Sequence, residues 1–190
     1  MRQDAALADV VLELPAVRLA RCVAVYAHLP GEPGTTLIRQ GLARRGVEVL
    51  LPVVAEDLHL DWAREEPVGD DGASSLDEQR LVPSRYAGGP EPTGPRLGQA
   101  ALERADVVLV PALAVDDRGH RLGQGAGCYD RALAWVLPGT PVLALLHDDE
   151  VLDSSLDPIP VEPHDRGVDG VLTPTRWIRL LWVTHAEGTR

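Results

Sequence analysis

Lysine and phenylalanine are absent from this 190-residue sequence, and all 18 of its basic residues are arginine. A phosphate-binding loop of the Walker A type needs a lysine near its end, so this way of binding a nucleotide is excluded. Cysteine is nearly absent too, because Cys22 and Cys128 are the only two. Two cysteines are too few for a disulfide framework or a cysteine-rich zinc site, and we expect neither.

Positive charge and long hydrophobic runs are also in short supply. The sequence has 29 acidic residues against 18 basic ones, which gives a net charge of −11, and such a surface repels nucleic acids and anionic membranes. No apolar run approaches the roughly 20 residues of a membrane span. The acidic residues Asp4, Asp9 and Glu13 do not suit a secretory signal. We therefore expect a cytoplasmic protein without nucleic-acid or membrane partners.

What the sequence does contain is an alternation of apolar runs and helical patterns, which is typical of βαβ units. We expect helices within residues 31–46 and 129–137, and strands at residues 21–29, 47–54, 57–63, 105–113, 140–147 and 168–174. These elements predict an α/β fold with three layers (αβα) and a mostly parallel, doubly wound, Rossmann-like sheet, in a single domain of residues 1–190. In such sheets ligands bind beyond the carboxyl ends of the strands.

Two connecting segments stand apart from this pattern. Residues 65–98 are polar and rich in Gly, Pro and Ser, which predicts a long surface excursion with little regular structure. The sequence DDRGHR predicts a turn centred on Gly119, and we expect Asp116 and Asp117 to serve that turn. The turn leads directly into a glycine-rich part of the chain.

Residues 121–131, with the sequence RLGQGAGCYDR, form a glycine loop ahead of a predicted helix. The dinucleotide-binding fingerprint does not fit, because its last glycine is replaced by Cys128 and no strand directly precedes the loop. Small residues that leave backbone N–H groups open, followed by a helix N-terminus, can form an anion site. Asp130 beside a phosphate would indicate a bridging Mg²⁺, with charge from Arg121 and Arg131. A flexible turn, in which Asp130 complements the helix dipole, explains the spacing equally well.

The wider segment of residues 110–133, VPALAVDDRGHRLGQGAGCYDRAL, resembles the signature of the 5-formyltetrahydrofolate cyclo-ligases, also called methenyltetrahydrofolate synthetases. Three further segments resemble family motifs in the same order: YAHLPGEPGTTLI (26–38), GPEPTG (89–94) and PVEPHDRGVDGVLTP (160–174). The resemblance implies that ATP phosphorylates the formyl oxygen of 5-formyltetrahydrofolate. N10 then attacks the formyl carbon, and 5,10-methenyltetrahydrofolate, ADP and phosphate result.

The resemblance also implies roles for individual residues. Glu32 matches a carboxylate that contacts the pterin ring, Asp130 and Asp165 match ligands of Mg²⁺, and Arg121 and Tyr129 match catalytic positions, Arg121 as a stabiliser of phosphate. Without the resemblance, Glu32 and Asp165 would be interpreted as ordinary loop carboxylates. The positions that match ATP-binding residues are Arg121, Leu122, Gly123, Gln124, Gly125, Ala126, Gly127, Cys128 and Tyr129, and those that match substrate-binding residues are Glu32, Gln124, Gly125, Ala126, Gly127 and Cys128.

The sequence departs from the family pattern at three places. Cys128 replaces a residue that is usually aromatic, and Ala126 replaces a Gly or Lys, which would strain the backbone if this position needs a positive φ. Residues 1–17 resemble the latter half of a longer helical region whose Lys and Arg hold ATP phosphates, so we expect a partial N-terminal helical region. An alternative function is therefore a catalytically impaired homologue that binds folate or nucleotide. In either case we expect a monomer with small-molecule partners.

Overall fold

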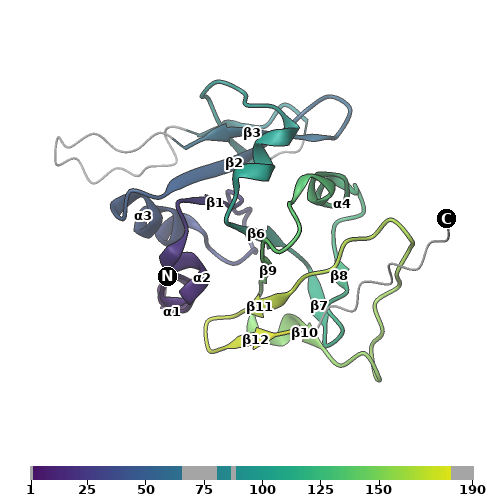
Figure 1. Ribbon diagram of the computed structural model, residues 1–190. Coiled ribbons are helices and arrows are strands. Elements are labelled where there is room, and N and C mark those ends of the chain that lie inside the picture. Colours follow the sequence, from purple (N-terminus) through teal and green to yellow (C-terminus); the bar gives the residue numbers. More distant parts are fainter. Residues whose placement is uncertain (1, 66–80, 87–88, 181–190) are drawn as a thin grey trace.

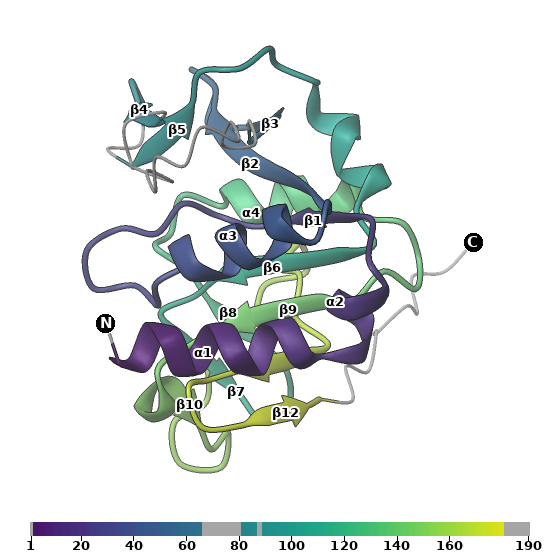
Figure 2. The ribbon, with the colours of Figure 1, turned by 90° about the vertical axis from the view of Figure 1, so that its left-hand side faces the viewer.

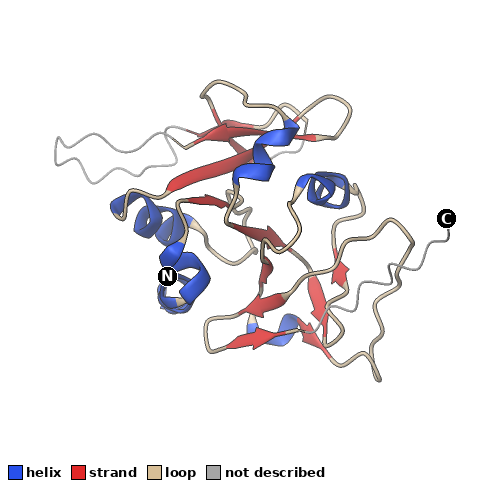
Figure 3. Cartoon of the chain, in the orientation of Figure 1, coloured by secondary structure: helices blue, strands red, loops and turns tan. Residues whose placement is uncertain are grey.

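The central sheet is the framework of the molecule (Figures 1 and 3). The computed structural model describes residues 2–65, 81–86 and 89–180, and within them this sheet has seven strands. In chain order the strands are β1 (Cys22–Ala24), β2 (Glu48–Val54), β3 (Leu60–Arg64), β6 (Val107–Pro111), β9 (Val142–Leu145), β11 (Gly170–Leu172) and β12 (Trp177–Arg179). The first six lie where the apolar runs predict strands, and β12 was not expected.

The strand order confirms a mostly parallel, doubly wound sheet. Across the sheet the order is β12-β11-β9-β6-β1-β2-β3, in which the five inner strands are parallel and both edge strands are antiparallel. Val23 of β1 pairs with Val49 of β2 on one side and with Val107 of β6 on the other. The chain therefore winds outward in opposite directions from β1 and β6. The carboxyl ends of this pair form the switch point at which such sheets bind ligands.

Helices cover both faces of the sheet, which confirms the three expected layers. α1 (Arg2–Glu13), α2 (Pro15–Leu19) and α3 (Thr36–Arg44) lie on one face, whereas η2 (Gln99–Arg104), α4 (Cys128–Ala132) and η3 (Leu133–Trp135) pack on the other (Figures 1 and 2). The sheet has a hydrophobic core on each face. Within β6, Val107 and Leu109 pack in the core on the side of α1, α2 and α3, and Val108 and Val110 pack in the core on the side of η2, α4 and η3. A strand buried on both faces needs a continuous apolar run, as the sequence provides.

Two elements are shorter than the sequence predicts. β1 stops at Ala24 instead of reaching residue 29. Val25 still donates to the carbonyl of Leu50 (2.9 Å), but the carbonyl of Tyr26 accepts a hydrogen bond from Thr35 Oγ1 (2.7 Å) and not from a neighbouring strand. α4 stops at Ala132 and tightens into the 3₁₀ helix η3 instead of running to Leu137. Leu137 precedes Pro138, and a residue before proline avoids helical backbone.

Smaller elements surround the main sheet. A second sheet consists of β7 (Ala114–Asp116), β8 (Arg121–Leu122) and β10 (Val151–Leu152). A hairpin consists of β4 (Leu81–Pro83) and β5 (Pro90–Pro92), and a 3₁₀ helix, η4, spans Asp148–Glu150. The expected excursion at residues 65–98 lies partly outside the described residues, and its described part includes the β4–β5 hairpin. None of the helices described here is long and apolar enough to span a membrane.

The turn between β7 and β8 is built on Asp116, as expected. Gly119 has a φ of 86°, a conformation that glycine adopts without strain. The buried carboxylate of Asp116 accepts hydrogen bonds from the N–H groups of Arg118 (3.0 Å) and His120 (2.9 Å), and it contacts the ring Nδ1 of His120 at 2.8 Å. Asp116 thereby fixes the strand that leads into the glycine loop.

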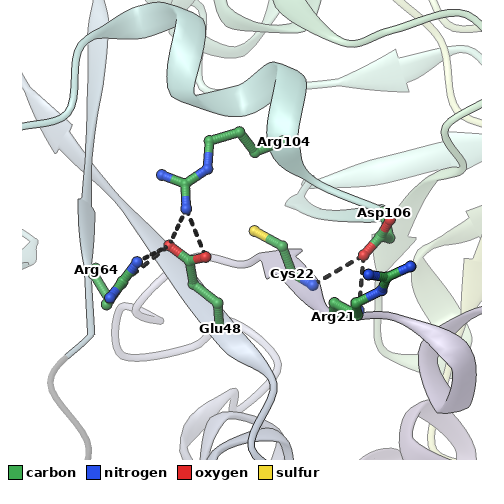
Figure 4. A network of polar contacts seen from close by, with 6 residues as sticks. All are labelled: Arg21, Cys22, Glu48, Arg64, Arg104 and Asp106. Atoms are coloured by element: carbon green, nitrogen blue, oxygen red, sulfur yellow. Dashed lines mark hydrogen bonds and ion pairs between the residues drawn. The ribbon is translucent and has the colours of Figure 1, made fainter.

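Polar contacts tie together the amino-terminal ends of the strands, far from the switch point (Figure 4). Glu48 at the start of β2 accepts hydrogen bonds from Arg64 of β3 (2.8 Å) and from Arg104 of η2 (2.7 Å). Asp106, just before β6, accepts hydrogen bonds through Oδ2 from the N–H groups of Arg21 (2.7 Å) and Cys22 (3.0 Å). These carboxylates hold β1, β2 and β6 at the end where they begin.

Replacing Asp106 tests this arrangement. Asp106→Ala leaves two backbone N–H donors at the start of β1 without their acceptor, and we expect a loss of about 1–2 kcal/mol in the free energy of unfolding. Urea denaturation followed by circular dichroism measures this loss. The exposed Asp9 of α1 provides the control, since Asp9→Ala should leave the midpoint unchanged. Equal midpoints for both variants would show that Asp106 does not hold β1.

Candidate functional site

A cavity of about 550 Å³ opens at the switch point between β1 and β6. Tyr26 and Ala27, which follow β1, line it together with Pro111 and Ala112 at the end of β6. Further parts of the wall come from the loop between β1 and α3, from the glycine loop, and from residues that β2, β3, the β4–β5 hairpin and the segment after β10 contribute. All residues for which the family resemblance implied a role line this one cavity: Glu32, Arg121, Leu122, Gly123, Gln124, Gly125, Ala126, Gly127, Cys128, Tyr129, Asp130 and Asp165.

The glycine loop enters from β8 and ends at the start of α4. Gly125 and Gly127 have φ values of 85° and 63°, so both occupy the left-handed region in which a side chain would strain the backbone. Ala126 between them has a negative φ, because Leu58 is the only described non-glycine residue with a positive one. The strain that the sequence suggested for Ala126 is therefore absent, and alanine fits this loop.

Arg121 and Asp130 form a nearly buried ion pair at the two ends of the glycine loop. Nη2 of Arg121 lies 2.6 Å from Oδ1 of Asp130, and the two side chains are only 4% and 18% exposed. The guanidinium carbon of Arg121 also lies 5.8 Å from the centre of the Tyr129 ring, which is favourable for a cation over an aromatic face. Nε of Arg121 is buried without a hydrogen-bond partner among the described residues. A permanent positive charge thus sits in the wall of the cavity.

The two expected metal ligands lie in the same cavity but make different contacts. Asp130 Oδ1 accepts a second hydrogen bond, from the N–H of Arg166 (3.2 Å), which brings residues 160–166 to the glycine loop. Asp165 accepts the N–H of Glu162 (2.7 Å), and its neighbour His164 is largely exposed. The described part of the chain holds no group of three or more His, Cys, Asp or Glu residues suited to a metal ion. Any cation here would need ligands from a bound substrate or water.

Glu32 stands on the opposite side of the cavity, in the loop between β1 and α3. Its Oε2 accepts the N–H of Leu29 (2.8 Å), and the amide of Gln124 lies 3.5 Å from Oε1, so the loop after β1 approaches the glycine loop. Burial, reinforced by the charge of Glu150, raises the pKa of Glu32 above the usual value, although the Leu29 hydrogen bond opposes this effect. The strength with which this carboxyl group accepts hydrogen bonds from a ligand's N–H groups therefore depends on pH.

Sequence reasoning missed several residues of the cavity wall. Tyr26 and Glu91 lie within the quoted motifs, so their motif membership was an available signal, whereas Leu60 of β3 belongs to no motif and only the fold brings it here. Tyr26 donates from its hydroxyl to the carbonyl of Pro33 (3.3 Å), and burial raises its pKa well above the usual value. Glu91 is 8% exposed and accepts the N–H of Val54 (2.8 Å).

Arg131 differs from the expectation that it supplies charge at a phosphate site. It is not among the residues that line the cavity. Its Nη2 instead donates hydrogen bonds to the carbonyl oxygens of Leu58 (2.8 Å) and Ala126 (3.0 Å). Of the two arginines in the loop, only Arg121 therefore faces the cavity.

Comparisons with known proteins agree with the family resemblance of the sequence. The model of the 5-formyltetrahydrofolate cyclo-ligase family matches residues 1–174. The 5-formyltetrahydrofolate cyclo-ligase of Mycolicibacterium smegmatis is 40% identical over 166 residues, which cover 85% of this chain and 77% of that protein. The enzyme of the same name from Escherichia coli is 32% identical over 170 residues, which cover 87% of this chain and 85% of that protein.

Solved structures share the fold. A 5,10-methenyltetrahydrofolate synthetase from Aquifex aeolicus superposes with a TM-score of 0.71 at 24% identity, over 97% of this chain and 87% of that one. A synthetase from Mycoplasma pneumoniae gives a TM-score of 0.64 at 16% identity, over 90% of this chain and 85% of that one. With the family match over most of its length, this chain belongs to the 5-formyltetrahydrofolate cyclo-ligase family.

Proposed function

We propose that this protein catalyses the ATP- and Mg²⁺-dependent cyclisation of 5-formyltetrahydrofolate to 5,10-methenyltetrahydrofolate, with release of ADP and phosphate. One observation carries the proposal: a single cavity at the switch point collects Glu32, the glycine loop, the Arg121–Asp130 pair and Asp165 from separate parts of the chain. A volume of about 550 Å³ is in the range of small-molecule sites. Membership of the family supports the same reaction.

The chemistry requires positioning and charge neutralisation more than covalent help from the protein. The formyl oxygen is a poor leaving group until it accepts the γ-phosphoryl group of ATP, with ADP as the first product. N10 then attacks the formyl carbon and loses its proton, and the C–O bond breaks to release phosphate. Negative charge develops on phosphoryl oxygens in the first step, and the nearly buried guanidinium of Arg121 can stabilise it, because charges interact more strongly away from water.

Glu32 suits the folate end of the cavity. The pterin ring carries N–H donors along its edge, and an ionised carboxylate accepts such donors through both oxygens, whereas a protonated carboxyl group accepts them more weakly. The loop that holds Glu32 is closed at its base by the hydrogen bond from Thr35 to Tyr26. Since Gln124 reaches toward Glu32, a folate bound there would have its reactive end near the glycine loop.

Asp130 and Asp165 are the residues that we propose to hold Mg²⁺. Both carboxylates line the cavity, and Mg²⁺ is commonly bound by one or two carboxylates together with substrate phosphates and water, so the donor set fits an ion that arrives with ATP. The ion would neutralise charge on the β- and γ-phosphates. Asp130 would then divide its oxygens between the cation and Arg121.

We further propose a cytoplasmic monomer with small-molecule partners and no nucleic-acid or membrane partner. The support is compositional: the net charge of −11 disfavours anionic polymers and surfaces, and only two cysteines are present.

Direct assay of the reaction tests the proposal. The protein mixed with 5-formyltetrahydrofolate, ATP and Mg²⁺ should generate the near-ultraviolet absorption of the methenyl product together with ADP, and chelation of Mg²⁺ by EDTA should stop both. Isothermal titration calorimetry with folate alone provides the comparison. Folate binding without product or ADP, even at high protein concentration, would support the impaired binding homologue and overturn the catalytic proposal.

Glu32→Gln tests the folate end of the cavity. We expect the KM for 5-formyltetrahydrofolate to rise about tenfold and the KM for ATP to stay constant, because one charge-assisted contact is lost. The pKa of Glu32 is raised, so in the wild type folate binding should weaken as the pH falls through that raised value, whereas the variant should lack this transition. Initial rates over a pH series measure both effects. Glu103→Gln on the exposed surface of η2 is the control, and identical pH profiles for Glu32→Gln and the wild type would remove Glu32 from the folate site.

A further inference from the structure

Arg131 links two segments of the chain that are far apart in sequence. It follows Asp130 in α4, yet its guanidinium lies outside the cavity. Nη2 donates one hydrogen bond to the carbonyl of Leu58, in the turn between β2 and β3, and another to the carbonyl of Ala126 in the glycine loop. The same nitrogen lies 3.9 Å from Sγ of Cys128. One side chain therefore fastens the glycine loop to the β2–β3 turn.

The β2–β3 turn is strained at the residue that Arg131 contacts. Leu58 has a φ of 60°, and its N–H donates to the carbonyl of Ala55 (3.0 Å). A left-handed conformation is unfavourable for leucine and persists only where surrounding contacts impose it. The Leu58 side chain is 39% exposed, so packing of that side chain does not explain the conformation. The turn itself accounts for it, because the N–H of Ala55 also donates to the carbonyl of His59 (2.9 Å) and leaves a three-residue hairpin loop whose last residue is left-handed. The hydrogen bond from Arg131 to the Leu58 carbonyl adds a contact to this strained residue.

The glycine loop is fitted to the same guanidinium. A Cβ atom added to Gly127 would lie 2.9 Å from Nη1 of Arg131, so the loop backbone packs directly against the arginine. Nε of Arg131 is buried without a hydrogen-bond partner among the described residues, which leaves Nη2 as its bonded nitrogen. The two N–H groups of Nη2 serve one carbonyl each, so this single nitrogen joins both segments.

We propose that Arg131 is a positioning residue for the glycine loop. By joining Ala126 to Leu58, it keeps the loop in the conformation in which Gln124, Cys128 and Tyr129 line the cavity. Its effect on turnover rests on the cyclo-ligase reaction proposed above, whereas the link between the two segments does not. Arg131 lies outside the cavity and acts through the loop.

Hydrogen–deuterium exchange without substrates tests the link itself. In Arg131→Ala, amides of residues 55–59 and of residues 122–128 should both exchange faster than in the wild type, while the exposed Arg44→Ala variant should leave both segments unchanged. Arg131→Lys, which keeps the charge, guards against a misfolded alanine variant and should give a smaller effect in the same two segments. Unchanged exchange in both segments for both variants would overturn the proposal, whether or not the protein is an active cyclo-ligase.

Kinetics test the consequence for catalysis. With the wild type active, Arg131→Ala should lose about 100-fold in kcat/KM, the size of effect expected when a loop is displaced by about 1 Å. Guanidinium ion at concentrations that do not unfold the protein should restore part of the lost activity, which a general loss of stability would not permit. Full activity in Arg131→Ala, or loss of activity without any rescue, would contradict the positioning role.

Discussion

The buried charge of Arg121 is the constraint on which the site depends. A guanidinium cannot lose its proton in a protein, so a side chain that is 4% exposed must have a partner, and Asp130 provides it at 2.6 Å. The two residues stand at opposite ends of the glycine loop, so their ion pair also closes that loop. Removing either partner would leave the other charge buried and unpaired, which is more costly than removing both. The Arg121–Asp130 ion pair therefore serves both the structure of the glycine loop and the chemistry proposed for the cavity.

The two ends of the parallel strands have different tasks. At the amino-terminal ends, Glu48 and Asp106 join neighbouring strands through hydrogen bonds and ion pairs (Figure 4). At the carboxyl ends, the chain leaves the sheet at Tyr26 and Pro111, and its loops surround the cavity. The separation allows the glycine loop and the loop of Glu32 to approach each other without being required to hold the sheet together.

Much of the fold and of the site could be predicted from the sequence because the signals are local. Continuous apolar runs predicted the parallel strands, and alternating glycines predicted a loop whose Gly125 and Gly127 have positive φ. The residues that the family resemblance singled out all line the cavity. What could not be predicted depends on contacts between distant segments. From the sequence alone, Arg131 could equally well contact a phosphate. Only the structure shows that it donates to the carbonyl of Leu58.

Features that appear only in the folded chain also explain the other differences between the expectations from sequence and the structure. Beyond β1 the carbonyl of Tyr26 bonds to Thr35, which directly precedes α3, and not to a neighbouring strand. Ala126 is unstrained because the positive φ values fall on its neighbours, which no count of glycines reveals. The left-handed conformation of Leu58 belongs to the three-residue loop between Ala55 and His59, and leucine gives no sequence signal for it because this position favours glycine.

The most direct measurement is the position of the ATP γ-phosphate. A crystal structure with 5-formyltetrahydrofolate and a non-hydrolysable ATP analogue should place both ligands in the cavity between β1 and β6. The γ-phosphate should contact the glycine loop and Arg121, and the pterin ring should contact Glu32. An ATP analogue bound outside this cavity, or a folate without contact to Glu32, would contradict the proposed site.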